Sequence, residues 1–212
     1  CDWSSTCALP ILPGLSTSNV AVLSSNQIQS LGRLQISNLS TDQIQNILVS
    51  NIGALLAAQI SALTISQVNA LTTSELANLQ TQQIASITTD GLAAMSLAQT
   101  QSLSSAQLNA LSVKQVKSLS TGFITQLSTD QLNALNAADI GYLNSLQWTS
   151  LSSEQVSALR TDQIQRISGS NLAAMGTDQI SAWSGEQIAA LTGPQISRLT
   201  TTDRKSTRLN SS

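Results

Sequence analysis

An eight-residue repeat runs through almost the whole of the 212-residue chain without an insertion or a deletion. The series that starts at Leu15 and steps by eight to Leu199 has 24 members, all large and apolar. Five residues after each of the first 23 members lies a second apolar column, from Val20 to Ile196, in which Thr100 is the only polar residue. A unit of eight residues is too short to be stable alone, so neighbouring octads must stack on one another as a solenoid.

The polar positions of the octad form a helix-capping pattern. Gln precedes the second apolar column in 16 of 23 octads, and Ser or Thr follows the leucine in 15 of 23. The consensus is Leu-Ser/Thr-x-x-Gln-Ile-x-Ala, and Ser/Thr-x-x-Gln is the capping box. In the octad 39–46, we expect the Ser40 hydroxyl to accept from the Gln43 amide and the Gln43 side chain to accept from the Ser40 amide. Leu39 and Ile44 then form the hydrophobic staple.

Apolar spacing and the placement of the acids both favour a helix. The apolar steps alternate five and three, which fits a helical face and would flip the face of a strand at each step. Seven acids fall at the second helical position and two, Glu75 and Asp139, at the third, where they complement the helix dipole. Pro194 also falls at a second helical position, where a missing amide hydrogen costs little. The seven are Asp42, Asp90, Asp130, Glu154, Asp162, Asp178 and Glu186.

These patterns predict an all-α solenoid of short capped helices, one per octad. The alternative is a β-solenoid with sixteen residues, two octads, per coil, because Ser, Thr and Gln ladders suit such coils. The octads 47–54, 87–94 and 167–174 lack the Gln and lie five octads and then ten octads apart. This spacing suggests a turn of five octads.

Three segments follow from the repeat. Residues 1–14 are an irregular lead-in, in which Cys1 and Cys7 are candidates for a disulfide that staples an N-terminal cap in an oxidising compartment. A redox pair is the alternative, although five intervening residues do not make a Cys-x-x-Cys motif. Residues 15–202 are the octad solenoid. Residues 203–212 break the phase, and we expect them to be a disordered, non-native tail. Because the first residue is Cys1 and not Met, we expect a fragment or a processed product.

The composition disfavours catalysis. The chain has no His, so the usual activating base for a serine and the commonest metal ligand are missing. The acids have capping positions, Lys114 and Lys117 suit a solvated face, and Trp148 and Trp183 stand in the core columns. We therefore expect no enzyme, no catalytic residue, no cofactor and no metal. The net charge of −2 argues against binding to nucleic acid. The sequence contains no run of eighteen apolar residues, so we expect no membrane span.

Three resemblances add to this interpretation. The element Leu-Ser/Thr-x-x-Gln, as at Leu39 and Leu151, is similar to the motif of the LTxxQ family of periplasmic helical chaperones, whose activity we do not carry over. The tiling of 15–202 resembles the Leu-Thr-Thr-x-Gln-Ile-x-Ala arrays of large bacterial secreted or surface, adhesin-like proteins. That resemblance implies an extracellular or cell-surface bacterial setting. Residues 203–212 resemble a translated short-read sequencing adapter, as in a metagenomic fragment.

The expected function is a non-enzymatic spacer or stalk of a larger bacterial surface or secreted protein. Its expected contact is end to end, with further repeats of the same chain. The alternative is a repetitive binding surface for a glycan, a polymer or a partner protein, for which the Gln column would be one candidate ladder. The variable positions of the octad favour the stalk.

Overall fold

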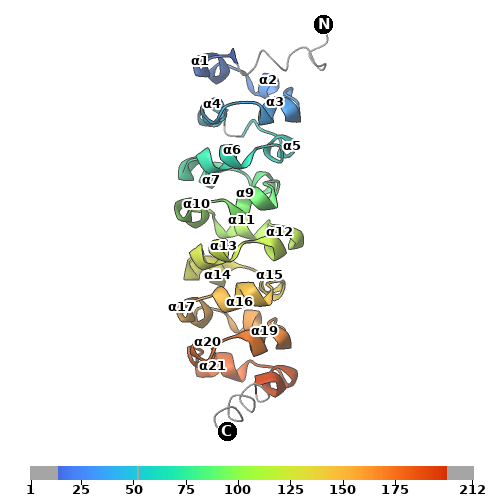
Figure 1. The fold of residues 1–212 in the computed structure, drawn as a ribbon, viewed down its shortest axis with the longest axis vertical. Coiled ribbons are helices and arrows are strands. Elements are labelled where there is room, and N and C mark those ends of the chain that lie inside the picture. The colour runs from blue at the N-terminus through green and yellow to red at the C-terminus, as the bar shows by residue number, and fades with distance from the viewer. Residues whose placement is uncertain (1–13, 52, 200–212) are drawn as a thin grey trace, which may run out of the picture. The chain divides into compact units, whose positions relative to one another are not determined.

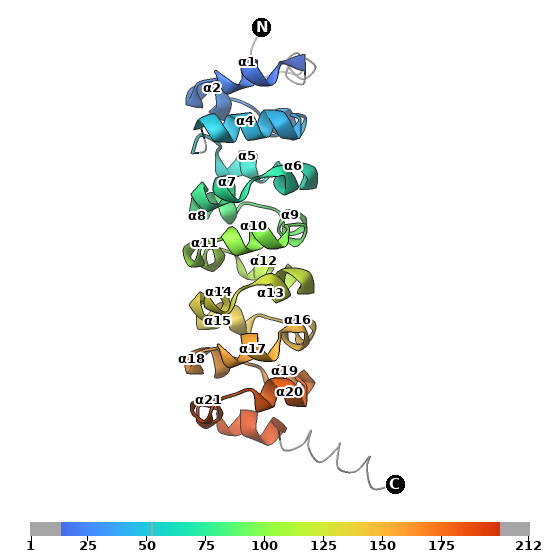
Figure 2. The ribbon, with the colours of Figure 1, turned by 90° about the vertical axis from the view of Figure 1, so that its left-hand side faces the viewer.

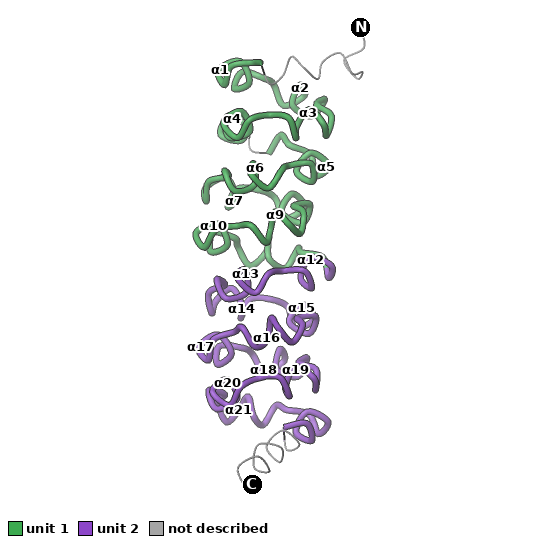
Figure 3. The backbone as a smooth tube through the Cα atoms, viewed as in Figure 1, with its two compact units in different colours: residues 1–112 green, residues 113–212 purple. Residues whose placement is uncertain are grey.

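The protein folds into short helices joined by tight corners, as the capping pattern predicts. The computed structural model describes residues 14–51 and 53–199 (Figure 1). They fall into two compact units, residues 1–112 and residues 113–212 (Figure 3). Within the described ranges every regular element is a helix and none is a strand. The all-α prediction is therefore confirmed, and the β-solenoid alternative is wrong.

The helices of unit 1 form three stacks. Helices whose octads are three octads apart in the sequence lie on one another, as α7 and α10 do in Figure 2. The first stack holds α1 (Thr17–Ala21), α4 (Thr41–Asn51), α6 (Ile65–Ala70) and α9 (Thr89–Ala93). The second holds α2 (Ser25–Gln29), α7 (Thr73–Asn78) and α10 (Leu97–Ser102). The third holds α3 (Arg33–Ser37), α5 (Ala57–Ile60), α8 (Thr81–Ile84) and α11 (Ser105–Asn109).

Unit 2 has the same arrangement within itself. Its first stack holds α12 (Val113–Ser118), α15 (Ala137–Gly141), α18 (Thr161–Ile164) and α21 (Gly185–Ala189). Its second holds α13 (Thr121–Gln126), α16 (Ser145–Ser150), α19 (Gly169–Ala174) and a helix over 193–199. Its third holds α14 (Thr129–Ala134), α17 (Ser153–Ser157) and α20 (Thr177–Ser181). One coil in either unit is therefore three octads, and the five-octad spacing of the octads without Gln does not mark a coil.

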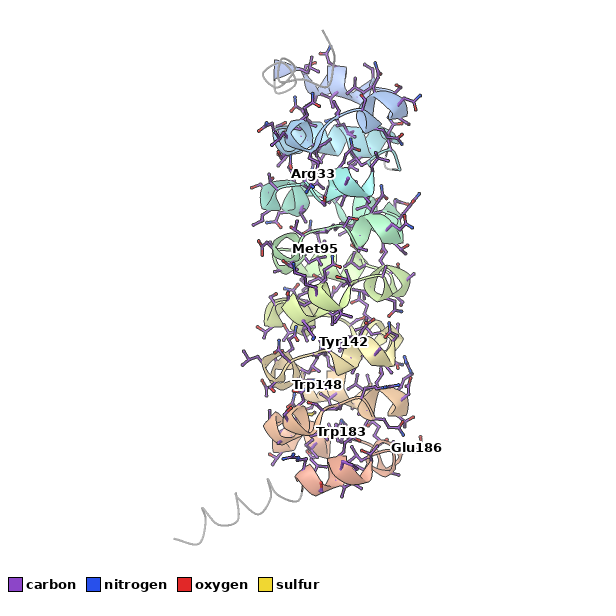
Figure 4. All side chains as sticks on the ribbon, turned by 90° about the vertical axis from the view of Figure 1, so that its right-hand side faces the viewer. Arg33, Met95, Tyr142, Trp148, Trp183 and Glu186 are labelled. Carbon is purple, nitrogen blue, oxygen red and sulfur yellow. The ribbon has the colours of Figure 1, made fainter. Side chains whose placement is uncertain are left out.

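Both apolar columns fill the core between the stacks. The leucine column is buried at every position from Leu39 to Leu191. Trp148 is fully buried and Trp183 is 7% exposed, so the prediction that both lie in the core is confirmed (Figure 4). Stacking is what buries the second column, because its last two members, Ile188 and Ile196, are 42% and 48% exposed.

One helix departs from the rule of one helix per octad. α4 runs for 11 residues through Ile47, where a new octad begins. That octad has Leu48 at the capping position and Asn51 at the Gln position. It is the one octad in the described ranges that lacks both partners of the capping box. With neither partner to stop it, the helix continues across the boundary, and Leu48 is fully buried.

Candidate functional site: the glutamine corners

The capping box forms as the sequence predicts. The Ser40 Oγ accepts from the Gln43 amide at 3.1 Å, and the Gln43 Oε1 accepts from the Ser40 amide at 2.8 Å. The Gln alone suffices where the cap residue has no hydroxyl, since the Leu56 and Arg160 amides both donate to the following Gln Oε1 at 2.9 Å. The side-chain oxygen thus satisfies an amide that the helix itself leaves unpaired.

The side-chain amide nitrogen of the column Gln, Nε2, bonds one coil to the previous coil. The Gln67 Nε2 donates to the carbonyl oxygens of Leu39 at 2.7 Å and Ile36 at 2.9 Å. These oxygens lie at the junction of two helices one coil earlier, and we call such a junction a coil corner. Equivalent bonds join Gln59, Gln99, Gln107, Gln147, Gln155, Gln163, Gln179 and Gln195 to carbonyls 28 and 31 residues earlier.

This donor role was missed at the sequence level, although a signal for it exists. A capping box accepts Glu as readily as Gln, yet the column holds 16 Gln and one Glu, Glu75. Only the amide can both accept from the cap and donate to a helix end, where the last carbonyls have no partner inside the helix. The bias toward Gln therefore reports stacking as well as capping.

Burial removes the Gln column from the candidates for a binding ladder. Every Gln of the column from Gln43 to Gln195 is buried, and Gln163 has no exposed surface. Gln27 and Gln35, in the first described octads, are exposed and half-buried. A glycan or polymer has no access to the buried side chains, so that interpretation of the column is wrong.

Two Asn residues in the column keep the stacking bond with a shorter side chain. The Asn51 Nδ2 donates to the Leu23 carbonyl at 3.3 Å, and the Asn171 Nδ2 donates to the Leu143 carbonyl at 2.9 Å. In each case a serine 26 residues earlier donates to the Asn Oδ1. The same solution in both units shows that these two octads preserve the link between coils without a Gln.

Two acids in the column lie in less favourable surroundings. The Glu75 Oε2 accepts from the Thr72 amide at 2.7 Å, while its Oε1 is buried with no hydrogen-bond partner. Burial raises the pKa of Asp139, and the hydrogen bond from the Asn136 side chain lowers it by a smaller amount. Neither carboxylate can supply the donor that Gln supplies.

The other acids take the helix-start positions that the sequence predicts, and they do not converge. All nine acids of the described ranges lie in the first turn of a helix. Asp162 bonds the Arg160 side chain at 3.0 Å, which lowers the pKa of Asp162. No group of three potential metal ligands occurs in the part of the chain that the structure describes. Cys1 and Cys7 lie outside it.

A pair of lysines and one hollow are further candidates for a site. Lys114 and Lys117 are exposed, as expected, and the Lys117 Nζ lies 5.6 Å from the centre of the Tyr142 ring. A hollow of about 410 Å³ beside α19 is lined by Gly169, Ser170, Ala173, Pro194, Gln195 and Arg198. That lining offers no carboxylate to activate its serine, so it does not form a nucleophile–base pair.

Comparison with known proteins supports the repeat type. The ALTTAQ repeat family matches residues 170–201. Within that segment Ala190–Gln195 has the sequence Ala-Leu-Thr-Gly-Pro-Gln, so the family's motif covers the end of one octad and the capping box of the next. No curated protein matches the chain. None of the described helices is long and apolar enough to cross a membrane.

Proposed function

We infer that this array of LTTxQ-like octads is a non-enzymatic spacer or stalk within a larger bacterial protein, at the cell surface or secreted. The observation that supports this role is the Gln bridge between coil corners, which recurs with the same donor and the same acceptors. Each added coil needs no new chemistry, because it binds carbonyls that the previous coil already presents. Length can then change by whole coils, as a spacer requires.

The last described coil supports end-to-end stacking of further repeats. Ile188 and Ile196 belong to a column that is buried in the earlier coils, and here they are exposed. Further octads of the same chain would bury them, and their Gln side chains would bond the corners of this coil. Residues 203–212 do not continue the octad phase, which fits a tail that is not native; they lie outside the described residues.

A deletion of one coil tests the modular spacer. Removing 143–166 from unit 2 takes out three octads and joins 142 to 167 in phase. We expect the helical circular dichroism to persist and the maximum dimension in small-angle X-ray scattering to shorten. Removing 147–166 is the matched control, because it breaks the octad phase and should destabilise the fold. If both deletions behave alike, stacking in register is not what carries the length.

Sequencing the gene through the codon for Thr202 with independent long reads tests whether the octads belong to a larger surface or secreted protein. Octads that continue into a secretion signal or an anchoring domain are the expected result. A confirmed stop codon directly after Ser212 would remove the support for a stalk. A lectin-like domain after further octads would instead favour a scaffold for binding.

The second candidate function is a binding surface for a glycan, a polymer or a partner protein. A repetitive surface needs the same exposed groups in successive coils, and the buried Gln column does not provide them. In unit 2 the same exposed charge recurs in three successive coils on one stack, through Asp130, Glu154 and Asp178, and the other two stacks show no such repeat. The spacer role therefore remains the better supported, with no cofactor implied.

A further inference from the structure

One stack of unit 2 carries only negative charge. Asp130, Glu154 and Asp178 lie in the first turns of α14, α17 and α20, each three octads from the next, and we call them the acidic column. All three residues are exposed, and their carboxylates form no ion pair within the described ranges. The octads of this stack contain no Lys or Arg.

The first stack of the same unit carries exposed positive charge. Lys114 and Lys117 lie on α12, Tyr142 follows α15, and Arg166 follows α18; we call these four residues the basic face. Tyr142, labelled in Figure 4, is 38% exposed and lies against the Lys117 ammonium. The basic face therefore has three cations, one of which, Lys117, lies over the Tyr142 ring.

The remaining exposed charges of these stacks leave the basic face intact. Arg160 and Asp162, also on the first stack, are paired with each other. Glu186 is exposed on α21, one coil beyond Arg166, and marks the end of the basic face. The second stack of unit 2 holds a single charged residue, Arg198.

Helix stability does not account for this division. An acid in the first turn is favourable in any helix, so the dipole explains the position within the octad and not the choice of stack. Lys114 occupies that same first-turn position with the opposite, unfavourable charge. Lys117 lies in the last turn of the same helix, where the dipole favours a cation, and it repels Lys114 one turn earlier. Lys114 is thus a charge kept against local stability, which is expected at an interaction surface.

The two charged surfaces match in length. The acidic column has one acid in each of three successive coils, and the basic face also spans three, with two cations on α12, Tyr142 in the middle coil and Arg166 after α18. Both follow the same coil-to-coil step, because they lie on stacks of one solenoid. We propose that unit 2 of one chain docks side by side on unit 2 of a second copy, basic face against acidic column. Each chain carries both surfaces, so the contact is heterologous and extends into rows.

Single exposed ion pairs are weak, so the association depends on several pairs and on low ionic strength. Sedimentation velocity of the full chain over a concentration series measures it. We expect association to weaken by at least about tenfold between about 20 mM and 500 mM salt. A chain that stays monomeric at low salt over the whole series overturns the proposal.

A charge swap identifies the two surfaces. The variant D130K/E154K/D178K and the variant K114E/K117E/R166E should each lose self-association. An equimolar mixture should associate again, because the first variant then presents only positive surfaces and the second only negative ones. Failure of the mixture to associate, with both variants helical by circular dichroism, contradicts the pairing. The milder set D130N/E154Q/D178N, which should weaken association, serves if the reversals unfold the chain.

A matched control adds charge elsewhere in unit 2. T125K/T149K/A173K places three lysines, also three octads apart and exposed, on the second stack. This variant should still associate as the unmodified chain does. If instead the chain stays monomeric and binds polygalacturonate through the basic face, the partner is an acidic polymer and the proposal is wrong. Neither result affects the spacer role, which the coil deletion tests separately.

Discussion

Two positions of the Gln column, Gln155 in unit 2 and Glu75 in unit 1, show what the stacking bond requires. Both side chains complete a capping box with the residue three positions earlier. The Gln155 Nε2 also donates to the carbonyls of Leu127 at 2.8 Å and Ile124 at 3.2 Å, at the corner between α13 and α14. The Glu75 Oε1 finds no partner.

The difference lies one coil earlier. The residues 28 and 31 positions before Glu75 are Ile47 and Ile44, both inside α4, where carbonyls are used by the helix itself. No corner exists there, because Leu48 and Asn51 fail to cap a new helix. A Gln at position 75 would have no open corner to bind. The missing cap at residues 48 and 51 therefore leaves no corner for the side chain at position 75 to bind, so the stacking bond places no demand for Gln there.

We expect the largest effect from a substitution that breaks the bonds of Gln155 to the corner between α13 and α14. Gln155→Glu keeps the acceptor for Ser152 but sets a carboxylate oxygen against the carbonyls of Ile124 and Leu127. Burying unpaired acceptors, one of them charged, should cost about 2–3 kcal/mol in the free energy of unfolding. Urea titration measures this cost. Gln27→Glu is the control at an exposed position of the same column and should change stability by less than about 0.5 kcal/mol.

Removing the hydroxyl of the same box separates capping from stacking. Ser152→Ala deletes the 3.1 Å bond from the Gln155 amide and leaves the Gln155 Nε2 in place. We expect a loss of about 1 kcal/mol, the usual value of an N-cap side chain. A loss as large as that of Gln155→Glu would mean that capping, and not stacking, dominates the corner.

Position 75, which has no corner one coil earlier, should respond less to the reverse substitution from Glu to Gln. Glu75→Gln exchanges the buried oxygen that lacks a partner for an amide nitrogen that also finds no corner to bind, so any gain should stay below about 1 kcal/mol. Thermal melting of the two proteins side by side measures the gain. If Glu75→Gln stabilises the protein by as much as Gln155→Glu destabilises it, the carbonyls of Ile44 and Ile47 are free to accept a hydrogen bond, and the explanation is wrong.

The smallest effect tests the second acid of the column through its pH dependence. Burial raises the folded-state pKa of Asp139 above 3.8, so the fold favours the neutral form. That contribution is complete below the unfolded pKa and is lost as pH rises through the folded value. Asp139→Asn should therefore stabilise the protein at pH 7, with the gain disappearing below about pH 4. The exposed Asp130→Asn should show no such gain.

Much of the fold was predictable because its determinants are local. The capping box at Ser40 and Gln43, the acids in first turns and the burial of Trp148 all follow from positions within one octad. The fusion of α4 also had a local signal, the joint loss of both box partners at Leu48 and Asn51, although we expected one helix for every octad. The bias of the column toward Gln is visible too, but capping explains it without any bond between coils.

The sequence by itself determined that each octad is a capped helix with two apolar residues to bury, because capping and the helix dipole act within a few residues. Only the tertiary structure decided that three octads close a coil, because this depends on how corners stack. It also decided that Gln67 binds Ile36 and Leu39, and that Glu75 faces an unbroken helix. An octad shows by its Gln that an amide is available to a helix end, but it does not show which corner lies 28 and 31 residues earlier, because that depends on the number of octads in a coil.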